Sequence, residues 1–520
     1  MTVINPNSIS GITSITLPSG DGNVLTIHTN DGTERFRIDS SGNVKVGSAC
    51  TISPDGDVFF TGVTTATTFT GAHSGSGANL TSLPAGNLTG ALPAISGANL
   101  TGIAATDNVR TGILDVAGVS TFRNTMNVGA AVTISESGLE ATGVGITVAN
   151  INGGQIGGRR NIIINGAMNV AQRATSSTSG GGYNTVDRID IRLNGANETP
   201  TQEQADVASG TSPYAEGFRK SYKITNGNQT GGADAGDYFF LFYQVEGQDI
   251  VQSGWNYVSP TSFITMSFWV KSSVAQNYYG YIRSRETTEQ SHAFDTGSLS
   301  ANTWTKVVRT FPGNSNIVMA NDNGQGLGIY LMPFMGADNT ADSKGITAWS
   351  AYSSTERTPD FASTWWTTND ATFEITGLQL EVGPQATAFE HRSFGEELSL
   401  CQRYYCMFAP YIGYNGRSNF AGVSEGATFY TQNNIFAQIE LPTTMRTTPS
   451  LVYATGTDYY IIYRQGGNQT FDDGISMEAI TDEGKVCINK NGTPSNAVAG
   501  DAALWRLNNN SAYMAANAEL

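Results

Sequence analysis

The chain has 520 residues and a net charge of −16, although only 14% of its residues are charged. Affinity for nucleic acid comes mostly from basic groups that neutralise phosphates, so this composition argues against DNA or RNA as a partner. No apolar run is long enough to span a membrane, and the first ten residues lack the basic and apolar parts of a signal peptide. We therefore expect synthesis in the cytoplasm, without membrane insertion and without the ordinary secretion route.

Aromatic residues are distributed very unevenly. Residues 1–160 contain no Trp, no Tyr and only five Phe, and every Trp and Tyr lies beyond them. Because aromatic side chains supply much of the apolar area of a core, this segment can hardly build a core of its own. We expect an elongated, repetitive β stalk over residues 21–158, followed by globular domains.

Short β segments are predicted across residues 18–65, where apolar and polar residues alternate between turn signals. A degenerate repeat follows, with the sequences GANLTSL, GNLTGAL and GANLTGI within residues 77–103. It places Leu80, Leu88 and Leu100 at equivalent positions, where three copies of the chain around a common axis would bury them. We expect these leucines to be the axial contacts of a trimer. The alternative is a disordered Gly/Ser/Thr linker.

Beyond residue 158 the pattern changes to aromatic and β-branched runs of strand length, such as YFFLFYQVE (238–246) and FITMSFWVKS (263–272). Many strands without intervening helices predict an antiparallel sandwich. We expect a mainly β chain with a jelly-roll-like sandwich over residues 159–393. A short helical connector over 394–405 and a smaller C-terminal β-sandwich over 406–520 are predicted to follow.

The four cysteines, Cys50, Cys401, Cys406 and Cys487, are too few and too scattered for a disulfide framework. We expect reduced thiols. Cys401 and Cys406 are close in sequence, but no second Cys or His pair has the spacing of a zinc site. The sequence therefore predicts no metal and no cofactor.

Two segments resemble a known family. TFEITGLQLEVGPQATAFEHRSFGEELSLCQRYY (372–405) is similar to a junction in many bacteriophage tail fibres and tail adhesins, where a sandwich likened to carbohydrate-binding modules passes into a helix. NIIINGAMNVAQR (161–173) resembles the start of that sandwich. The phrases GTERFRIDSSGNVKVG, GVTTATTFTG and SGANLTSL resemble stalks of fibres from phages that infect marine cyanobacteria.

The resemblance implies a homotrimer on the virion, released from the host by lysis. It implies that residues 1–20 attach to phage tail or baseplate proteins. The C-terminal domain, residues 406–520, would be the tip that binds a host cell-surface glycan or surface protein.

Exposed rings beside amide and carboxylate groups are the side chains that sugars require. Trp365 and Trp366 beside Asn369 and Asp370 are the first predicted contacts, although one tryptophan of the pair can instead close the core. A second candidate pair lies nearer the predicted tip and consists of Tyr411 and Tyr414.

Two other functions remain open. A tailspike that degrades polysaccharide would need paired carboxylates. Acidic pairs such as Asp472 and Asp473 occur, but no pattern fixes their geometry, and no nucleophile or metalloprotease motif is present. We therefore expect no enzymatic activity. A virion fibre without a receptor, such as a head fibre, whisker or collar protein, would share the stalk and the trimer.

Overall fold

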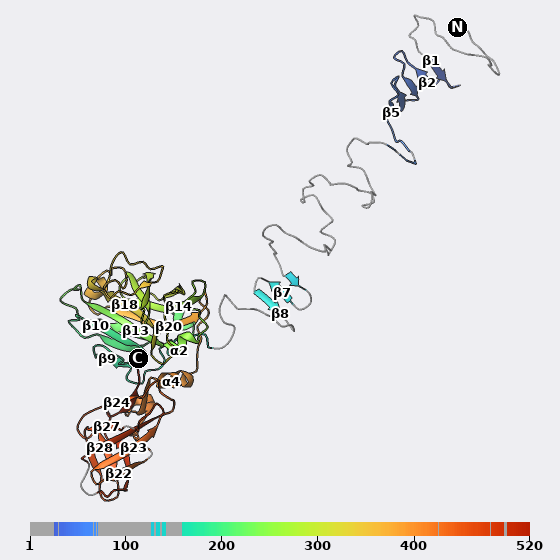
Figure 1. Ribbon diagram of the computed structural model, residues 1–520. Coiled ribbons are helices and arrows are strands. Elements are labelled where there is room, and N and C mark those ends of the chain that lie inside the picture. The colour runs from blue at the N-terminus through green and yellow to red at the C-terminus, as the bar shows by residue number, and fades with distance from the viewer. Residues whose placement is uncertain are drawn as a thin grey trace, which may run out of the picture. The chain divides into compact units, whose positions relative to one another are not determined.

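The computed structural model describes residues 25–29, 31–65, 67–68, 70, 126–128, 132–135, 138–141, 159–424, 426–478, 480–492 and 497–520 (Figure 1). The chain forms two compact units, and the boundary between them lies between Phe122 and Arg123. The described residues are mainly β, in antiparallel sheets. Among them, no helix combines the length and the apolar character that crossing a bilayer requires. The predicted axial contacts Leu80, Leu88 and Leu100 lie outside the described residues.

The N-terminal unit contains a five-stranded meander in which each strand pairs with the next along the chain. Tight turns join the strands, and Gly32 and Gly42 adopt φ angles of 77° and 82°, which glycine tolerates without strain. The Asp39 carboxylate fixes one turn by accepting hydrogen bonds from the backbone N–H groups of Ser41 and Asn43, both at 3.0 Å. The strands are β1 (Leu25–His28), β2 (Glu34–Ile38), β3 (Val44–Val46), β4 (Cys50–Ile52) and β5 (Val58–Phe60).

One face of this meander is apolar on every strand. Directly paired residues share a face of a sheet, and the pairing aligns two apolar rows. No described residue between 25 and 70 is buried, and Val46 and Phe60 are 49% and 53% exposed. The described N-terminal residues therefore leave this apolar face uncovered. The first row is Leu25, Ile38, Val44, Ile52 and Val58, and the second is Ile27, Phe36, Val46, Cys50 and Phe60.

A three-stranded meander begins the described part of the second unit. It consists of β6 (Met126–Val128), β7 (Val132–Ser135) and β8 (Gly138–Ala141), which pair antiparallel in chain order. It continues the β pattern that the sequence predicts for residues 21–158.

Two six-stranded sheets, whose strands lie between Ser176 and Val382, form the predicted sandwich (Figure 1). One sheet has the strand order β10-β13-β18-β15-β16-β19, and the other has the order β17-β14-β20-β12-β11-β9. The strands of the first sheet are β10 (Asp190–Asn194), β13 (Tyr238–Glu246), β15 (Asn277–Ser284), β16 (Gln290–Ser298), β18 (Gln325–Met335) and β19 (Ser350–Ala351). Those of the second are β9 (Ser176–Ser177), β11 (Thr201–Asp206), β12 (Lys220–Thr225), β14 (Phe263–Ser272), β17 (Thr305–Pro312) and β20 (Thr372–Val382).

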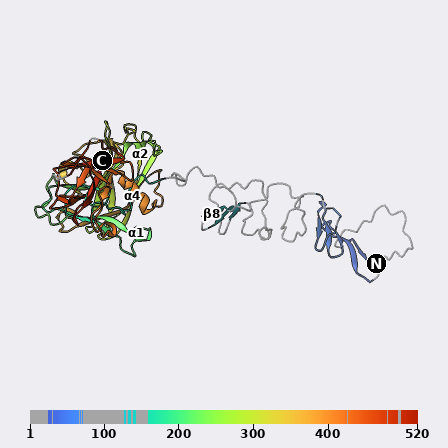
Figure 2. The same ribbon diagram turned by 90° about the horizontal axis from the view of Figure 1, so that it is seen from below.

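The core of the sandwich lies between the two sheets. Alternate residues of β13, namely Phe239, Leu241 and Tyr243, point into it and meet residues of the facing sheet such as Ile375 and Leu380. The helices of this domain are short. They are α1 (Ser212–Ala215), α2 (Gly247–Val251), the 3₁₀ turn η3 (Ala337–Asn339) and α3 (Thr364–Thr367). In Figure 2, α1 and α2 lie at the periphery of the globular part.

The C-terminal domain has its own core around the fully buried Trp505 and Tyr460. Its sheets have the orders β21-β30-β24 and β26-β25-β29-β22-β23-β28-β27. The strands are β21 (Tyr405–Ala409), β22 (Ala427–Thr431), β23 (Asn434–Glu440), β24 (Ser450–Tyr453), β25 (Tyr460–Tyr463), β26 (Gln469–Phe471), β27 (Ile475–Met477), β28 (Lys485–Asn491), β29 (Ala502–Leu507) and β30 (Met514–Asn517). The 3₁₀ turn η4 (Tyr414–Gly416) follows β21.

Helix α4 (Phe394–Gln402) connects the two sandwiches, and the residues after it fasten one to the other. Arg403 Nε and Nη2 donate to the two carboxylate oxygens of Glu246, at 2.8 Å each. The Tyr404 hydroxyl donates to the same carboxylate at 2.5 Å. Gln172 Nε2 donates to the carbonyl oxygen of Tyr405 at 2.6 Å. The CQRYY sequence that supports the family resemblance is therefore the joint between the domains.

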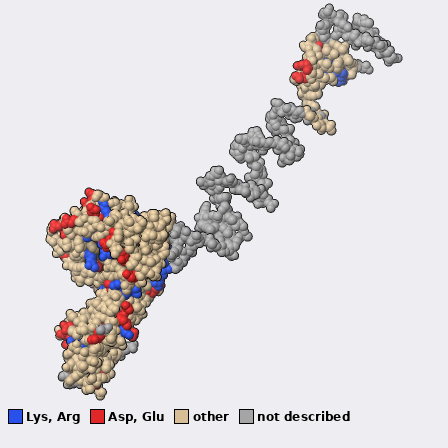
Figure 3. Space-filling model, in the orientation of Figure 1, with Lys and Arg blue, Asp and Glu red and all other residues tan. Residues whose placement is uncertain are grey.

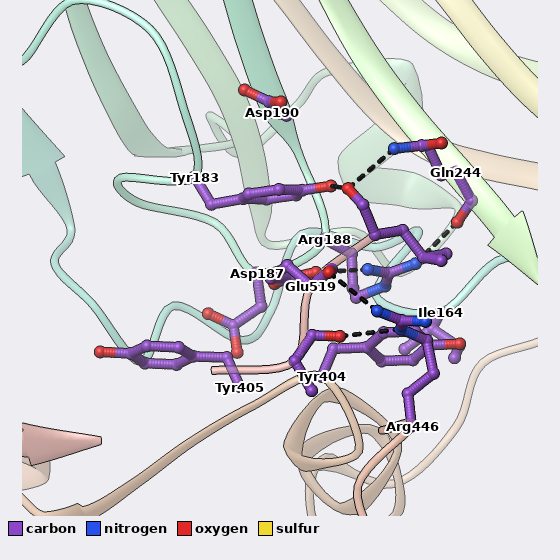
Figure 4. A network of polar contacts seen from close by, with 12 residues as sticks. Ile164, Tyr183, Asp187, Arg188, Asp190, Gln244, Tyr404, Tyr405, Arg446 and Glu519 are labelled. Carbon is purple, nitrogen blue, oxygen red and sulfur yellow. Dashed lines mark hydrogen bonds and ion pairs between the residues drawn. The ribbon is translucent and has the colours of Figure 1, made fainter. Parts of the chain in front are cut away.

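Residues 518–520, which follow β30, also belong to this joint (Figure 4). The Glu519 carboxylate pairs with Arg188, and with Arg173 Nη2 at 3.3 Å. Arg188 also donates to the carbonyl oxygen of Gln244 at 2.6 Å and lies 3.5 Å from the centre of the Tyr404 ring. The side chains of Arg188 and Glu519 are only 1% and 5% exposed, so this is a buried ion pair.

Candidate functional site

The two tryptophans predicted to contact a glycan are buried. Trp365 and Trp366, on α3, are both 0% exposed. Their rings pack against Phe239 with centroid distances of 5.5 and 5.1 Å, and their indole N–H groups donate to the carbonyl oxygens of Thr372 and Gly232. Neither ring offers a face to a ligand in solvent. The prediction of an exposed pair is therefore wrong, because both tryptophans, and not one of them, belong to the core.

The other predicted contacts lie in two separate places. Asn369 and Asp370 are exposed after α3. Tyr411 and Tyr414 are half-buried and lie close together in the C-terminal domain, with ring centroids 5.9 Å apart. They pack with Tyr513 against Tyr405, Met407 and Ala515. The structure thus keeps the predicted tyrosine pair together. It separates the two buried tryptophans from the exposed polar residues that were predicted to bind a glycan with them.

A cleft that the sequence did not predict lies on the outer face of the first sheet of the sandwich, away from its core. Its volume is about 310 Å³. We call it the aromatic–arginine cleft, because its lining is made of rings, guanidinium groups and a few amides. The lining residues are Arg192, Tyr238, Phe240, Phe242, Gln244, Tyr281, Arg283, Arg285, Gln325, Tyr330, Tyr352, Arg357 and Leu520.

Strand register assembles the floor of this cleft. Phe242 of β13 is directly paired with Tyr330 of β18, which is directly paired with Tyr281 of β15. Their rings stack in sequence, with centroid distances of 4.5 Å and 4.1 Å. Gly328 leaves room for this stack, since a Cβ there would lie 2.9 Å from Tyr330 and 3.1 Å from Phe242. The stacked rings themselves are buried.

Two half-exposed tyrosines end a continuous chain of rings. From Tyr238 the chain runs through Phe240, Tyr330 and Tyr281 to Tyr352, with centroid distances of 5.3, 5.7, 4.1 and 6.2 Å. The backbone of Tyr352 is held over the sheet by its N–H, which donates to the carbonyl oxygen of Glu289 at 3.0 Å. Tyr238 and Tyr352 are therefore the rings that a ligand in the cleft can reach.

Four guanidinium groups surround these rings. Arg192 pairs with Asp190 at 2.6 Å, and Arg283 pairs with Glu289 and lies 3.3 Å from the centre of the Tyr352 ring. Burial opposes the charge of Arg283, but its hydrogen bond to Glu289 acts together with the electrostatic effects of Tyr330, Tyr352 and Glu289 and keeps the pKa of Arg283 above its usual value. Burial raises the pKa of Tyr281 well above its ordinary value, so the tyrosines of the floor are neutral at pH 7. Figure 3 shows a group of Lys and Arg in the middle of the sandwich face seen there.

A second cavity of about 240 Å³ lies where residues 159–164 pass α2 and α4. It is also lined by arginines, but their donors are used within the domain. Arg403 holds Glu246, Arg160 donates to Thr387, and Arg392 donates to the carbonyl oxygen of Ile163 at 3.0 Å. This cavity therefore has fewer free donors to offer than the aromatic–arginine cleft.

Within the described part of the chain, no group of three or more His, Cys, Asp or Glu side chains has the arrangement of a metal site. Cys401, Cys406 and Cys487 are buried and unbridged, and burial raises the pKa of each thiol. These cysteines behave as small core residues and not as reactive groups.

No protein-family model and no curated protein matches this sequence. Among solved structures, the enzymatically active domain of tailspike protein 4 from bacteriophage CBA120 is similar over 43% of this chain and 21% of that chain, with 8% identity and a TM-score of 0.22. This chain thus spans about a fifth of the tailspike chain it matches.

Carbohydrate-binding modules are also similar to this chain. The family 11 module from Clostridium thermocellum, solved with a mixed-linked tetrasaccharide, matches over 41% of this chain and 99% of that chain, with 11% identity and a TM-score of 0.20. The CBM22-1-CBM22-2 tandem domain of Paenibacillus barcinonensis Xyn10C matches over 72% of this chain and 100% of that chain, with 9% identity and a TM-score of 0.21. Phage adhesins and glycan-binding proteins are thus among the structures similar to this chain, at scores too low to carry an argument about function.

Proposed function

We propose that this protein is a glycan-binding adhesin that holds a saccharide in the aromatic–arginine cleft. The observation that carries the proposal is the chain of rings that ends in the half-exposed Tyr238 and Tyr352, bordered by guanidinium and amide groups. Sugars place their C–H faces on aromatic rings, and their hydroxyl groups need directed polar partners. A cleft of about 310 Å³ is at the small end of the range for ligand pockets, so it suits one or two sugar units of a longer polymer.

Paired tyrosine substitutions test this site. Tyr352→Ala removes an accessible ring of the cleft, and Tyr411→Ala removes a ring of equal size from the tyrosine pair in the C-terminal domain. On an array of bacterial surface polysaccharides, we expect Tyr352→Ala to weaken binding roughly tenfold, the upper end of what one aromatic contact contributes, and Tyr411→Ala to leave it unchanged. The opposite result would place the glycan on the C-terminal domain and contradict the cleft.

We further propose that the chain is a homotrimeric bacteriophage tail fibre that attaches the particle to its host, with its N-terminal residues on the phage tail or baseplate. The sequence resemblance of residues 161–173 and 372–405 supports this proposal. The uncovered apolar face of β1–β5 supports self-association, because every strand contributes apolar residues to one side and they need a covering surface. A second and a third copy of the same face would supply it.

Light scattering of the full chain tests the self-association. Phe36 lies between Ile27 and Val46 in the second apolar row, whereas Arg37 lies on the opposite face of the same strand. We expect Phe36→Asp to reduce the trimer to monomers and Arg37→Asp to leave it intact. A wild-type monomer, or equal behaviour of the two variants, would contradict this role of the face.

Gold-labelled antibodies on phage particles test the location. Label on the tail together with blocked adsorption is the expected result. Label on the head with normal adsorption would favour a fibre without a receptor.

We propose no chemistry for the cleft, and incubation with bound polysaccharide should produce no new reducing ends. New reducing ends would identify a degrading tailspike instead.

A further inference from the structure

We infer that the saccharide of the aromatic–arginine cleft is anionic and carries carboxylate or sulfate groups. This inference rests on the proposed function and names the ligand class of the same site. It depends on the balance of charges in the cleft, on the donors left free there and on the scarcity of acceptors.

Positive charge exceeds negative charge in the cleft. Its lining contains four arginines and, among the described residues, no Asp or Glu side chain. Two carboxylates pair with these arginines: Asp190 with Arg192, and Glu289 with both Arg283 and Arg285. Counting the main-chain carboxylate of Leu520, which also lines the cleft, four arginines face three carboxylates, so a net positive charge remains in a chain whose net charge is −16. The rest of the chain repels a polyanion, so an attraction would be local to this cleft.

Arg357 keeps one nitrogen of its guanidinium, Nη2, outside the hydrogen bonds of the described residues. Its Nε donates to the Tyr352 hydroxyl at 3.2 Å, and its Nη1 lies 3.7 Å from the sulfur of Met335. No carboxylate of the described residues pairs with it. A guanidinium fork matches the planar oxygens of a carboxylate and the oxygens of a sulfate, and such charge-assisted hydrogen bonds are about twice as strong as neutral ones. Arg357 is thus a ready partner for an anionic group beside the half-exposed Tyr352 ring.

The acceptors of the cleft are few by comparison. Gln325 Oε1 already accepts from Arg285 Nε at 3.0 Å, and Gln244 Oε1 is buried out of a ligand's reach. A neutral sugar presents mostly hydroxyl groups, each of which must donate one hydrogen bond. A cleft rich in fixed donors and poor in fixed acceptors instead matches a ligand with spare acceptor oxygens, which carboxylate and sulfate groups provide.

Matched pairs of polymers test the inference. Dextran sulfate and dextran share a backbone, and pectate and methyl-esterified pectin share another, so each pair differs in charge alone. We expect the full-length protein to be retarded by the charged member of at least one pair in affinity electrophoresis. The sulfate and carboxylate arms then identify the anionic group. Added salt should weaken the retardation, because the contact is electrostatic.

Arginine variants locate the binding. We expect Arg357→Gln to weaken it roughly 10- to 100-fold and Arg357→Lys, which keeps the charge without the fork, to recover part of the loss. Arg417→Gln makes the same change of charge at an exposed position of the C-terminal domain and should have no effect. Unchanged melting temperatures will show that the variants are folded.

Three outcomes would overturn the inference. Equal binding of neutral and charged polymers, lost in Tyr352→Ala, would overturn it and leave the proposed function standing. Equal weakening by Arg357→Gln and Arg417→Gln would show attraction to the whole chain and not to the cleft. Retention of none of the four polymers, together with binding of neutral polysaccharides on the array that Tyr352→Ala abolishes, would overturn the inference alone, and the absence of any such binding on the array would overturn the proposed function as well.

Discussion

The buried ion pair between Arg188 and Glu519 should hold the C-terminal domain on the sandwich. Arg188→Met tests this directly, because methionine keeps an unbranched apolar chain beside the Tyr404 ring and removes the guanidinium. The Glu519 carboxylate, 5% exposed, would then keep Arg173 at 3.3 Å as its remaining cationic partner. The carbonyl oxygen of Gln244 would lose its donor as well.

The expected cost follows from these contacts. Removing one partner of a buried pair costs about 3–5 kcal/mol, and the remaining Arg173 places this case near 3 kcal/mol. Because a tenfold change in an equilibrium constant corresponds to about 1.4 kcal/mol, local opening at the joint should become roughly two orders of magnitude more frequent. The opening would be seen first in β30, whose backbone pairs with both β21 and β24.

Hydrogen exchange measured by mass spectrometry reports this opening peptide by peptide. We expect faster exchange in the peptide that contains β30 and little change in β13 or β20. Arg309→Met is the matched control, since Arg309 is 33% exposed and its ion pair with Asp295 should contribute less than about 1 kcal/mol. In the double variant with Glu519→Gln, the cost should be smaller than the sum of the single costs. Additive effects, or normal exchange in Arg188→Met, would refute this account of the joint.

Three further predictions follow from single residues. Burial raises the pKa of Asp187 to about 6, so the native state holds this proton more tightly than the unfolded chain does. The free energy of unfolding should therefore fall by up to roughly 3 kcal/mol as the pH rises from about 4 to about 6, and calorimetry should find this slope missing in Asp187→Asn. Gly328→Ala should displace the stacked rings of Tyr330 and Phe242, and should weaken saccharide binding in titrations without unfolding the protein. Trp366→Ala should lower stability by about 3–5 kcal/mol in thermal unfolding, because the ring is fully buried. Lost binding with unchanged stability would show that the ring contacts a ligand after all.

Much of the fold could be predicted from strand-length patterns. The predicted runs 238–246 and 263–272 coincide with β13 (Tyr238–Glu246) and β14 (Phe263–Ser272), and α4 (Phe394–Gln402) lies within the predicted connector. These segments are long and their composition is strongly β-branched and aromatic, so local preference and tertiary packing agree. Pairing partners were not predictable, because β13 lies between β10 and β18, which are distant from it in sequence.

The binding residues were harder to predict, because the sequence alone does not show whether an aromatic ring points into the core or toward solvent. Trp365 and Trp366 stand between polar residues, as exposed rings do, yet the short helix α3 turns both into the core. The ring of Tyr281 is only 1% exposed, yet it lies under the cleft and not in the main core. Burial alone therefore does not separate core rings from rings that support a binding site.

The sequence contains one pattern that indicates the cleft. This pattern does not predict the cleft without knowledge of the strand register. Strands β13, β15 and β18 carry aromatic residues on their outer faces, where an antiparallel sheet is commonly polar. On each strand, a polar residue or a glycine lies two positions from the outer ring: Gln244, Arg283 and Gly328. Pairing places these three in one row across the sheet, directly beside the stacked rings. Because a shift of one residue would send the row to the opposite face, the cleft is a consequence of register more than of any single motif.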